Sequence, residues 1–197
     1  DHLVAAALPL SGAAAVSVVE AVGPVAGQTI LVNGASGGVG SFVVQMLVAR
    51  GGEVIGTGSA SDVERLLRLG VANVVDFTLG PIAEQVRDVQ PTGVDSLVNL
   101  FGMSVDQVPL SAVRQGGIVV TTTSAPKADS IEASGLRVEF IHARPQTDVL
   151  DSLARGASDG TLSVEVEATV PLTEAIEWLS TIAAGGAHGK IVVDLST

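Results

Sequence analysis

The stretch Thr29-Ile30-Leu31-Val32-Asn33-Gly34-Ala35-Ser36-Gly37-Gly38-Val39-Gly40-Ser41 decides the fold of this chain. A short apolar run rich in β-branched residues leads into a turn that holds four glycines within seven residues, and a helix-like pattern begins at Val39. This order predicts a buried strand, a sharp turn and a helix whose N-terminus points at an anionic group.

The glycines of this turn favour a bound phosphate. Gly34 and Gly37 would let the backbone turn and approach a phosphate without a Cβ in the way, and Gly40 would let the helix pack tightly on the strand. The spacing is not the commoner G-x-G-x-x-G, and no Gly-Lys-Ser/Thr follows to make a P-loop. An ordinary tight turn, the alternative, would carry fewer glycines. We therefore expect a dinucleotide to be held by its pyrophosphate at Gly34, Ser36, Gly37, Gly38, Val39 and Gly40.

Composition limits the kind of protein. Of the 197 residues, 47% are hydrophobic and 16% are charged, which favours an α/β protein with buried parallel strands over a disordered chain. The net charge is −11, from ten basic and 21 acidic residues without a basic cluster, so neither nucleic acid nor a membrane surface is an expected partner. The apolar run over 3–22 is interrupted by Pro, Ser, Gly and Glu and lacks a basic leader, so no targeting or spanning segment is expected.

Cysteine and tyrosine are both absent. Without cysteine the chain forms no disulfide, thiolate or Cys-ligated zinc site, and a reducing, cytoplasmic location is expected. With only three scattered histidines, we predict no metal site. Without tyrosine, the Tyr-x-x-x-Lys mechanism of short-chain dehydrogenases is excluded.

Strands and helices are predicted to alternate after an opening helix over 3–22 that is broken near Pro9. The predicted strands cover 29–33, 53–57, 73–77, 95–100, 118–122 and 137–142. The predicted helices between them cover 39–50, 62–69, 82–89 and 105–114, the second of them beginning with a capping box formed by Ser61 and Glu64. This alternation predicts βαβ units and a parallel sheet, and six strands with a glycine turn after the first match the doubly wound Rossmann fold.

The doubly wound fold places the ligand at the carboxyl ends of the strands. Residues that directly follow strands, together with one cation on the helix after the second strand, are therefore further candidates for cofactor contact. They are Ser59, Ser61, Arg65, Leu100, Phe101, Thr122, Thr123, Phe140 and His142.

The last part of the chain follows a different pattern. Helices are predicted over 147–158 and 174–184, and strands over 162–170 and 190–195. Two strands separated by one helix do not continue the six-stranded sheet, and we expect them to need partners outside this chain.

Several motifs occur in the order and register of a known family. They are Ala5-Ala6-Ala7-Leu8-Pro9-Leu10-Ser11-Gly12, the glycine turn from Val32 to Gly40, Gly56-Thr57, Arg68-Leu69-Gly70-Val71, Gly116-Gly117 and Gly189-Lys190-Ile191-Val192. With these motifs the chain resembles the medium-chain dehydrogenase/reductase superfamily, specifically its zinc-independent quinone oxidoreductase-like branch. The resemblance covers essentially all 197 residues.

The resemblance implies a nicotinamide-dependent reductase of two domains, with a GroES-like catalytic domain preceding this region. On that basis we expect a linker helix over 1–24, a Rossmann domain over 25–146 and a closing segment over 147–197 that completes the missing domain. The implied substrate is a small quinone or α,β-unsaturated carbonyl compound. The alternative is a cofactor-binding module without turnover of its own. The family also pairs the sixth strand, here 137–142, across a two-fold axis, which implies a homodimer.

The cofactor choice is read from the end of the second strand. A site for NAD places Asp or Glu there to hold the ribose 2′-hydroxyl, but residues 57–61 contain no acid. The missing acid favours NADP(H) over NAD(H). Against it, Asp62 would repel a 2′-phosphate, and Arg65, the nearest cation, has a solvated helix face as its alternative role. No catalytic side chain is assigned, because the nicotinamide itself supplies the hydride.

Overall fold

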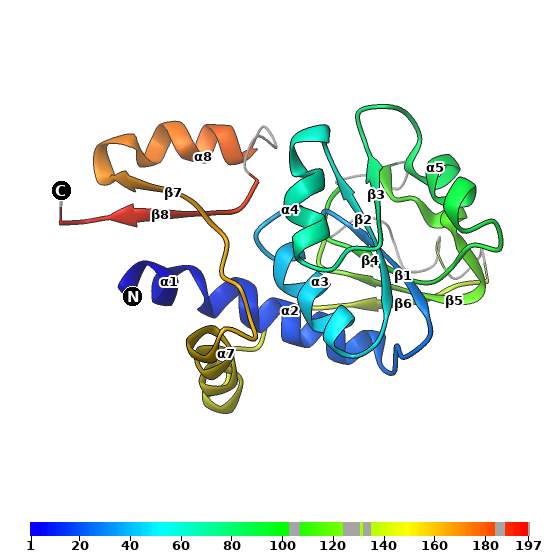
Figure 1. Ribbon diagram of the computed structural model, residues 1–197, viewed down its shortest axis with the longest axis horizontal. Helices are drawn as coiled ribbons and strands as arrows, with labels where there is room; N and C mark the ends of the chain where they lie inside the picture. Colours follow the sequence, from blue (N-terminus) through cyan, green and yellow to red (C-terminus); the bar gives the residue numbers. More distant parts are fainter. Residues whose placement is uncertain (103–106, 124–130, 132–134, 184–187, 197) are drawn as a thin grey trace.

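The computed structural model describes residues 1–102, 107–123, 131, 135–183 and 188–196. A large α/β body and a small two-stranded sheet lie at opposite ends, with both termini near the small sheet (Figure 1). Within the described residues, no helix is both long enough and apolar enough to cross a membrane.

The large body is built on a six-stranded sheet in which every strand pair is parallel. Its strands are β1 (Thr29–Asn33), β2 (Glu53–Gly58), β3 (Asn73–Asp76), β4 (Val94–Asn99), β5 (Val113–Thr121) and β6 (Arg137–Phe140). Their order is β3-β2-β1-β4-β5-β6, so the chain reverses direction across the sheet between β1 and β4. The predicted doubly wound Rossmann fold is confirmed. Its switch point lies between β1 and β4, at the end of β1 where the glycine turn begins.

Helices cover both faces of this sheet. They are α2 (Pro9–Val22), α3 (Gly40–Ala49), α4 (Val63–Arg68) and α5 (Ile82–Val89), with the short α1 (His2–Ala7) at the start of the chain. Alternate residues of β1 point to opposite faces of the sheet. Ile30 and Val32 pack with side chains of α2 and α3, and Leu31 packs in the core on the other face. All five residues of β1 are buried, as a central parallel strand requires.

The closing segment runs beside the large body before it forms its own sheet. α7 (Thr147–Asp159) packs on α2, where a Cβ at Gly12 would stand 2.8 Å from Cδ1 of Leu153. The chain then passes α3, where the amide of Gln45 makes two hydrogen bonds with the backbone of Ser163, at 2.7 and 3.0 Å. β7 (Val166–Pro171) and β8 (Lys190–Asp194) pair in parallel with one another and contact α1.

The described part of the connection between these two strands contains a helix, the usual crossover of a parallel pair. It is α8 (Ala175–Ala183), preceded by the short turn η4 (Leu172–Glu174). Large apolar side chains of this unit are exposed, among them Leu172, Ile176 and Leu179 at 61–78%.

The predicted helix over 105–114 is wrong within its described part. Residues 105 and 106 lie outside the described residues, and the following stretch holds only the short turn η3 (Leu110–Ala112), which begins after Pro109. β5 starts at Val113, and its register with β4 shifts between the Val94–Val113 and Ser96–Ile118 pairs. Gly116, with φ of +74°, lies in this irregularity inside the strand and does not separate a helix from a strand.

The predicted capping box is displaced by two residues. Ser59, not Ser61, has the extended backbone of an N-cap, and its side chain and backbone exchange hydrogen bonds with Asp62, not Glu64. The turn η1 (Ala60–Asp62) therefore precedes α4, and Ser61 lies inside it. Glu64 instead pairs with Arg68 on the exposed face of α4.

Candidate functional site

A cleft of about 890 Å³ lies at the carboxyl ends of the central strands. The glycine turn forms its floor, and residues after β4 and at the start of β8 form its walls. Seven of the sequence-predicted residues line it: Gly34, Ser36, Gly37, Gly38, Val39, Leu100 and Phe101.

Backbone geometry makes two of the turn's glycines necessary. Gly34 has φ of +89°, a left-handed conformation, and its N–H donates to Oγ1 of Thr57 at 2.8 Å. A Cβ on Gly40 would stand 2.1 Å from the carbonyl oxygen of Gly34. Gly40 is therefore buried packing between helix and strand, and it does not line the cleft.

A ladder of buried polar side chains runs beneath the turn. Nδ2 of Asn33 donates to Oδ1 of Asn99 at 2.8 Å, and Oγ1 of Thr57 donates to Oδ1 of Asn33 at 3.3 Å. Nδ2 of Asn99 continues to Oγ1 of Thr121 and Thr123 at 3.3 and 3.2 Å. The ladder thus joins the ends of β2, β1, β4 and β5.

Sequence reasoning missed the ladder, although a signal was present. Asn33, Asn99 and Thr121 each end a buried apolar strand with a polar side chain, and all three are at most 2% exposed. Buried amides and hydroxyls need partners, so polar strand ends on adjacent strands indicate one another.

The candidates after β5 and β6 lie outside the cleft lining. Thr122 is exposed and its N–H donates to the carbonyl oxygen of Asn99 at 3.2 Å, while Thr123 belongs to the ladder. Phe140, at the end of β6, is 41% exposed, and His142 is exposed beyond it.

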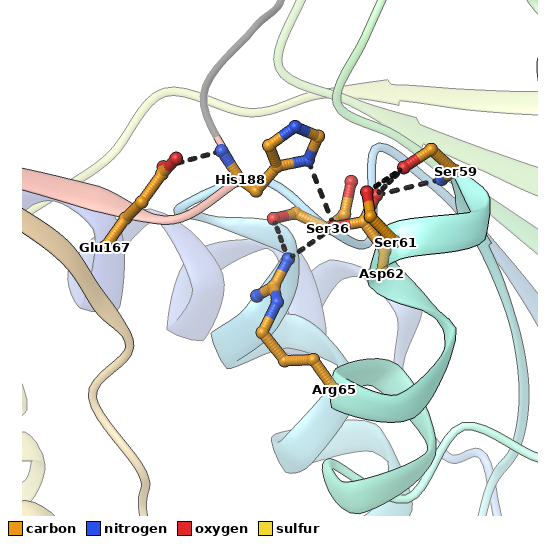
Figure 2. A network of polar contacts seen from close by, with 7 residues as sticks. All are labelled: Ser36, Ser59, Ser61, Asp62, Arg65, Glu167 and His188. Atoms are coloured by element: carbon orange, nitrogen blue, oxygen red, sulfur yellow. Dashed lines mark hydrogen bonds and ion pairs between the residues drawn. The ribbon is translucent and has the colours of Figure 1, made fainter.

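Asp62 lies in η1, shortly after the end of β2, and its carboxylate is buried and hydrogen-bonded within the protein. Its side chain is 2% exposed, and its Oδ2 accepts from the backbone N–H and the hydroxyl of Ser59, both at 2.8 Å (Figure 2). Ser61 stands within 2.8 Å of the same hydroxyl. Burial alone would raise the pKa of Asp62, but the hydrogen bonds from Ser59 and Arg65 and the charge of His188 lower the pKa below its ordinary value.

Arg65 ties this carboxylate to the glycine turn. Its Nη2 donates to Oδ1 of Asp62 at 3.1 Å and to the carbonyl oxygen of Ser36 at 2.7 Å. Arg65 is 15% exposed, so the alternative of a solvated helix face is wrong. Its Nη1 is buried and has no hydrogen-bond partner among the described residues. The charge of Asp62 is thus balanced inside the protein.

Lys190 is a further cleft residue, quoted in the sequence only as part of a motif. Its Nζ donates to Oγ of Ser11 at 2.9 Å, and its stem crosses the glycine turn so closely that a Cβ on Gly38 would stand 2.6 Å from Cδ. Burial lowers the pKa of Lys190. Of the described cleft residues it alone is a lysine or arginine.

The fold and the cleft define a doubly wound Rossmann domain whose cleft lies over the glycine turn. A family model described as zinc-binding dehydrogenase matches residues 69–193. The chain belongs to this family, among the quinone oxidoreductase-like proteins of the medium-chain dehydrogenase/reductase superfamily. The resemblance to the quinone oxidoreductase-like proteins of this superfamily is confirmed, and the expectation that no zinc is bound stays a prediction.

Relatives and solved structures agree with this assignment. The chain is 28% identical to NAD(P)H oxidoreductase RTN4IP1, mitochondrial, of Mus musculus, over 98% of this chain and 56% of that protein. It is 30% identical to 2-methylene-furan-3-one reductase of Solanum lycopersicum, over 96% of this chain and 46% of that protein. The chain therefore spans about half the length of these relatives.

Two solved structures share the fold. The quinone oxidoreductase from Coxiella burnetii superposes with a TM-score of 0.87 at 22% identity, covering 97% of this chain and 60% of that one. Mycobacterial Rv1454c complexed with NADPH superposes with a TM-score of 0.85 at 22% identity, covering 98% and 66%.

Removing the carboxylate of Asp62 will destabilise the domain. Asp62→Ala leaves Arg65 without its ion partner in a buried position, and we expect a loss of about 3 kcal/mol in the free energy of unfolding. The matched control is Glu64→Ala, which removes the exposed partner of Arg68 and will leave stability unchanged within error. Urea unfolding monitored by circular dichroism measures both, and equal effects would contradict a structural role for the Asp62 pair.

Proposed function

We propose that this chain is the cofactor-binding part of an NAD(P)H-dependent oxidoreductase that transfers hydride to a quinone or an enone. The observation that carries the proposal is the glycine turn held over the buried polar ladder at the switch point of the sheet. The mouse and tomato relatives are named as an oxidoreductase and a reductase, which supports the reaction class.

The residues of the cleft fit a dinucleotide. The pyrophosphate would lie over the turn from Gly34 to Val39, where the first N–H groups of α3 and the helix dipole attract an anion. Lys190 adds a positive charge above the same turn. The proposed nicotinamide contacts in the cleft lining are Leu100 and Phe101, while Thr122, Thr123, Phe140 and His142, which lie outside that lining, stay predictions.

NADPH is the proposed preferred cofactor. The first carboxylate after β2, that of Asp62, is buried against Ser59 and Arg65, and the next, that of Glu64, pairs with Arg68. The repulsion of a 2′-phosphate expected from Asp62 is therefore much reduced, and Ser59, Ser61 and Arg65 remain as proposed contacts for the adenosine end.

The bound nicotinamide supplies the hydride, and this chain positions it and excludes water. We propose that no zinc is needed, since the sequence has no cysteine and the described residues hold no group of three or more His, Asp or Glu side chains that could bind a metal ion. The alternative is a protein that holds the cofactor without turnover. A cytoplasmic location stays a prediction.

Lys190 provides the first test. Lys190→Met will weaken binding of both NADPH and NADH about tenfold, because a charge-assisted contact to the pyrophosphate is lost, while Lys190→Arg will retain most of the affinity. Fluorescence titration of each reduced cofactor measures the effect. Arg68→Met, which removes an exposed cation outside the cleft, is the control. Equal affinity of wild type and Lys190→Met would contradict the placement of the pyrophosphate.

Turnover separates the two candidate functions. The full-length protein will oxidise NADPH when phenanthrenequinone is added, and EDTA will leave the rate unchanged because no metal takes part. Loss of absorbance at 340 nm measures the rate. A full-length protein that binds NADPH but oxidises none with quinones or enones would favour the cofactor-binding module.

The edge of the sheet is the proposed dimer contact. Among the residues that the structure describes, β6 is the last strand of the six and pairs on one side only, and Phe140 on it is 41% exposed. An unpaired apolar edge tends to acquire a partner strand. Sedimentation velocity will show a dimer for the full-length protein and a shift to monomer for Phe140→Lys, with the exposed Phe77→Lys on β3's side of the sheet as control. A monomeric wild type would overturn the proposal.

A further inference from the structure

A histidine of the closing segment reaches the end of β2. His188 precedes β8, its ring lines the cleft, and its Nδ1 stands 3.1 Å from Oδ1 of Asp62 (Figure 2). Its backbone N–H donates to Oε2 of Glu167 on β7 at 2.7 Å. Residues 126 apart in the sequence therefore meet at one point.

This point is where a dinucleotide's second ribose is recognised. In the doubly wound fold the residue that follows strand two reads the ribose 2′ position. Here Ser59 follows β2 and bonds to Asp62, and His188 bonds to the other oxygen of the same carboxylate, so two hydrogen bonds through Asp62 join His188 to that position.

The hydrogen bond to Asp62 dictates the state of the ring. A carboxylate only accepts, so Nδ1 of His188 carries the hydrogen and Nε2 has none when the imidazole is neutral. Nε2 then accepts a hydrogen bond, and after protonation it donates one. Figure 2 shows the outer ring nitrogen turned away from Asp62, and the ring is 40% exposed.

The net charge around Asp62 depends on whether the imidazole of His188 is protonated. Asp62 on η1 and Arg65 on α4 cancel, and Glu167 on β7 adds one negative charge beside the backbone of His188. Lys190, on His188's own side of the cleft, bonds to Ser11. The cluster of Asp62, Arg65, Glu167 and His188 is therefore negative by one with neutral His188 and uncharged with protonated His188. The second state is therefore more favourable for a phosphate dianion than the first.

We propose that His188 sets the choice between NADPH and NADH: neutral Nε2 accepts from a ribose 2′-hydroxyl, and the protonated ring binds a 2′-phosphate. The inference rests on the proposed cofactor site and deepens it. Protonation of His188 at lower pH then raises the preference for NADPH over NADH.

Cofactor titrations across pH provide the test. Dissociation constants of NADPH and NADH are measured by fluorescence from pH 5.5 to 8.5 for wild type, His188→Asn and the control His2→Asn, whose ring is 85% exposed at the terminus. Asn keeps a donor for Asp62 but takes up no proton. The preference for NADPH will rise about tenfold in wild type and His2→Asn relative to His188→Asn. The 2′-phosphate of NADPH itself gains a proton near pH 6. This effect is the same for wild type and His188→Asn, so it cancels when the two proteins are compared.

Proton uptake gives a second reading that needs no variant. Calorimetry at pH 7.5 in two buffers of different ionisation enthalpy will show that wild type takes up a proton with NADPH and none with NADH. Absence of uptake, or an equal pH slope in wild type and His188→Asn, overturns the inference while the cofactor site stands. Failure of both cofactors to bind at every pH overturns the proposed function as well. If His188→Asn fails to fold, the calorimetry of wild type decides.

Discussion

The contact between Gly40 and the carbonyl oxygen of Gly34 is the constraint on which the rest of the structure depends. With 2.1 Å between that oxygen and any Cβ, only glycine lets α3 begin directly above the end of β1. Because the helix starts there, its N-terminal N–H groups face the carboxyl ends of β1 and β4, the switch point of the sheet. A displaced helix would close the cleft or turn its dipole away from it. The close packing of α3 on β1 and the position of the helix N-terminus at the cleft therefore both depend on the absence of a side chain at Gly40.

The polar ladder makes this arrangement rigid. Asn33 and Asn99 are both buried and bonded to each other, so neither strand end moves without leaving an amide unsatisfied. Thr57 extends the constraint to the turn itself, since its hydroxyl oxygen accepts the N–H of Gly34. The cleft is thus shaped by side chains that do not need to touch a ligand. A protein that positions a cofactor gains from such support, because small displacements of the reacting atoms reduce the rate of transfer strongly.

Most of the large sheet could be predicted from the sequence, and the reasons are local. β-branched runs between glycine turns identify buried parallel strands, and the helices between them have the expected period. The failures have equally physical causes. The apolar stretch around Val108 looked helical, but Pro109 interrupts it and β5 begins early. Ser59 and Ser61 have the same chemistry, and only the backbone decides which one caps the helix. Arg65 and His188 converge on Asp62 through tertiary packing that no local pattern contains.

The network around Asp62 also changes how an acid near the end of β2 is interpreted. A sequence rule treats any carboxylate there as a ligand for the ribose or as a barrier to phosphate. Asp62 is neither on its own, because its oxygens are occupied by Ser59, Arg65 and His188. The carboxylate of Asp62 acts on its partners instead. It fixes the tautomer of His188, and it holds Arg65 beside the glycine turn. The residues before β8 bring His188 to this point, so the closing segment and the Rossmann sheet both contribute residues to one cleft, and the proposed cofactor selectivity depends on both.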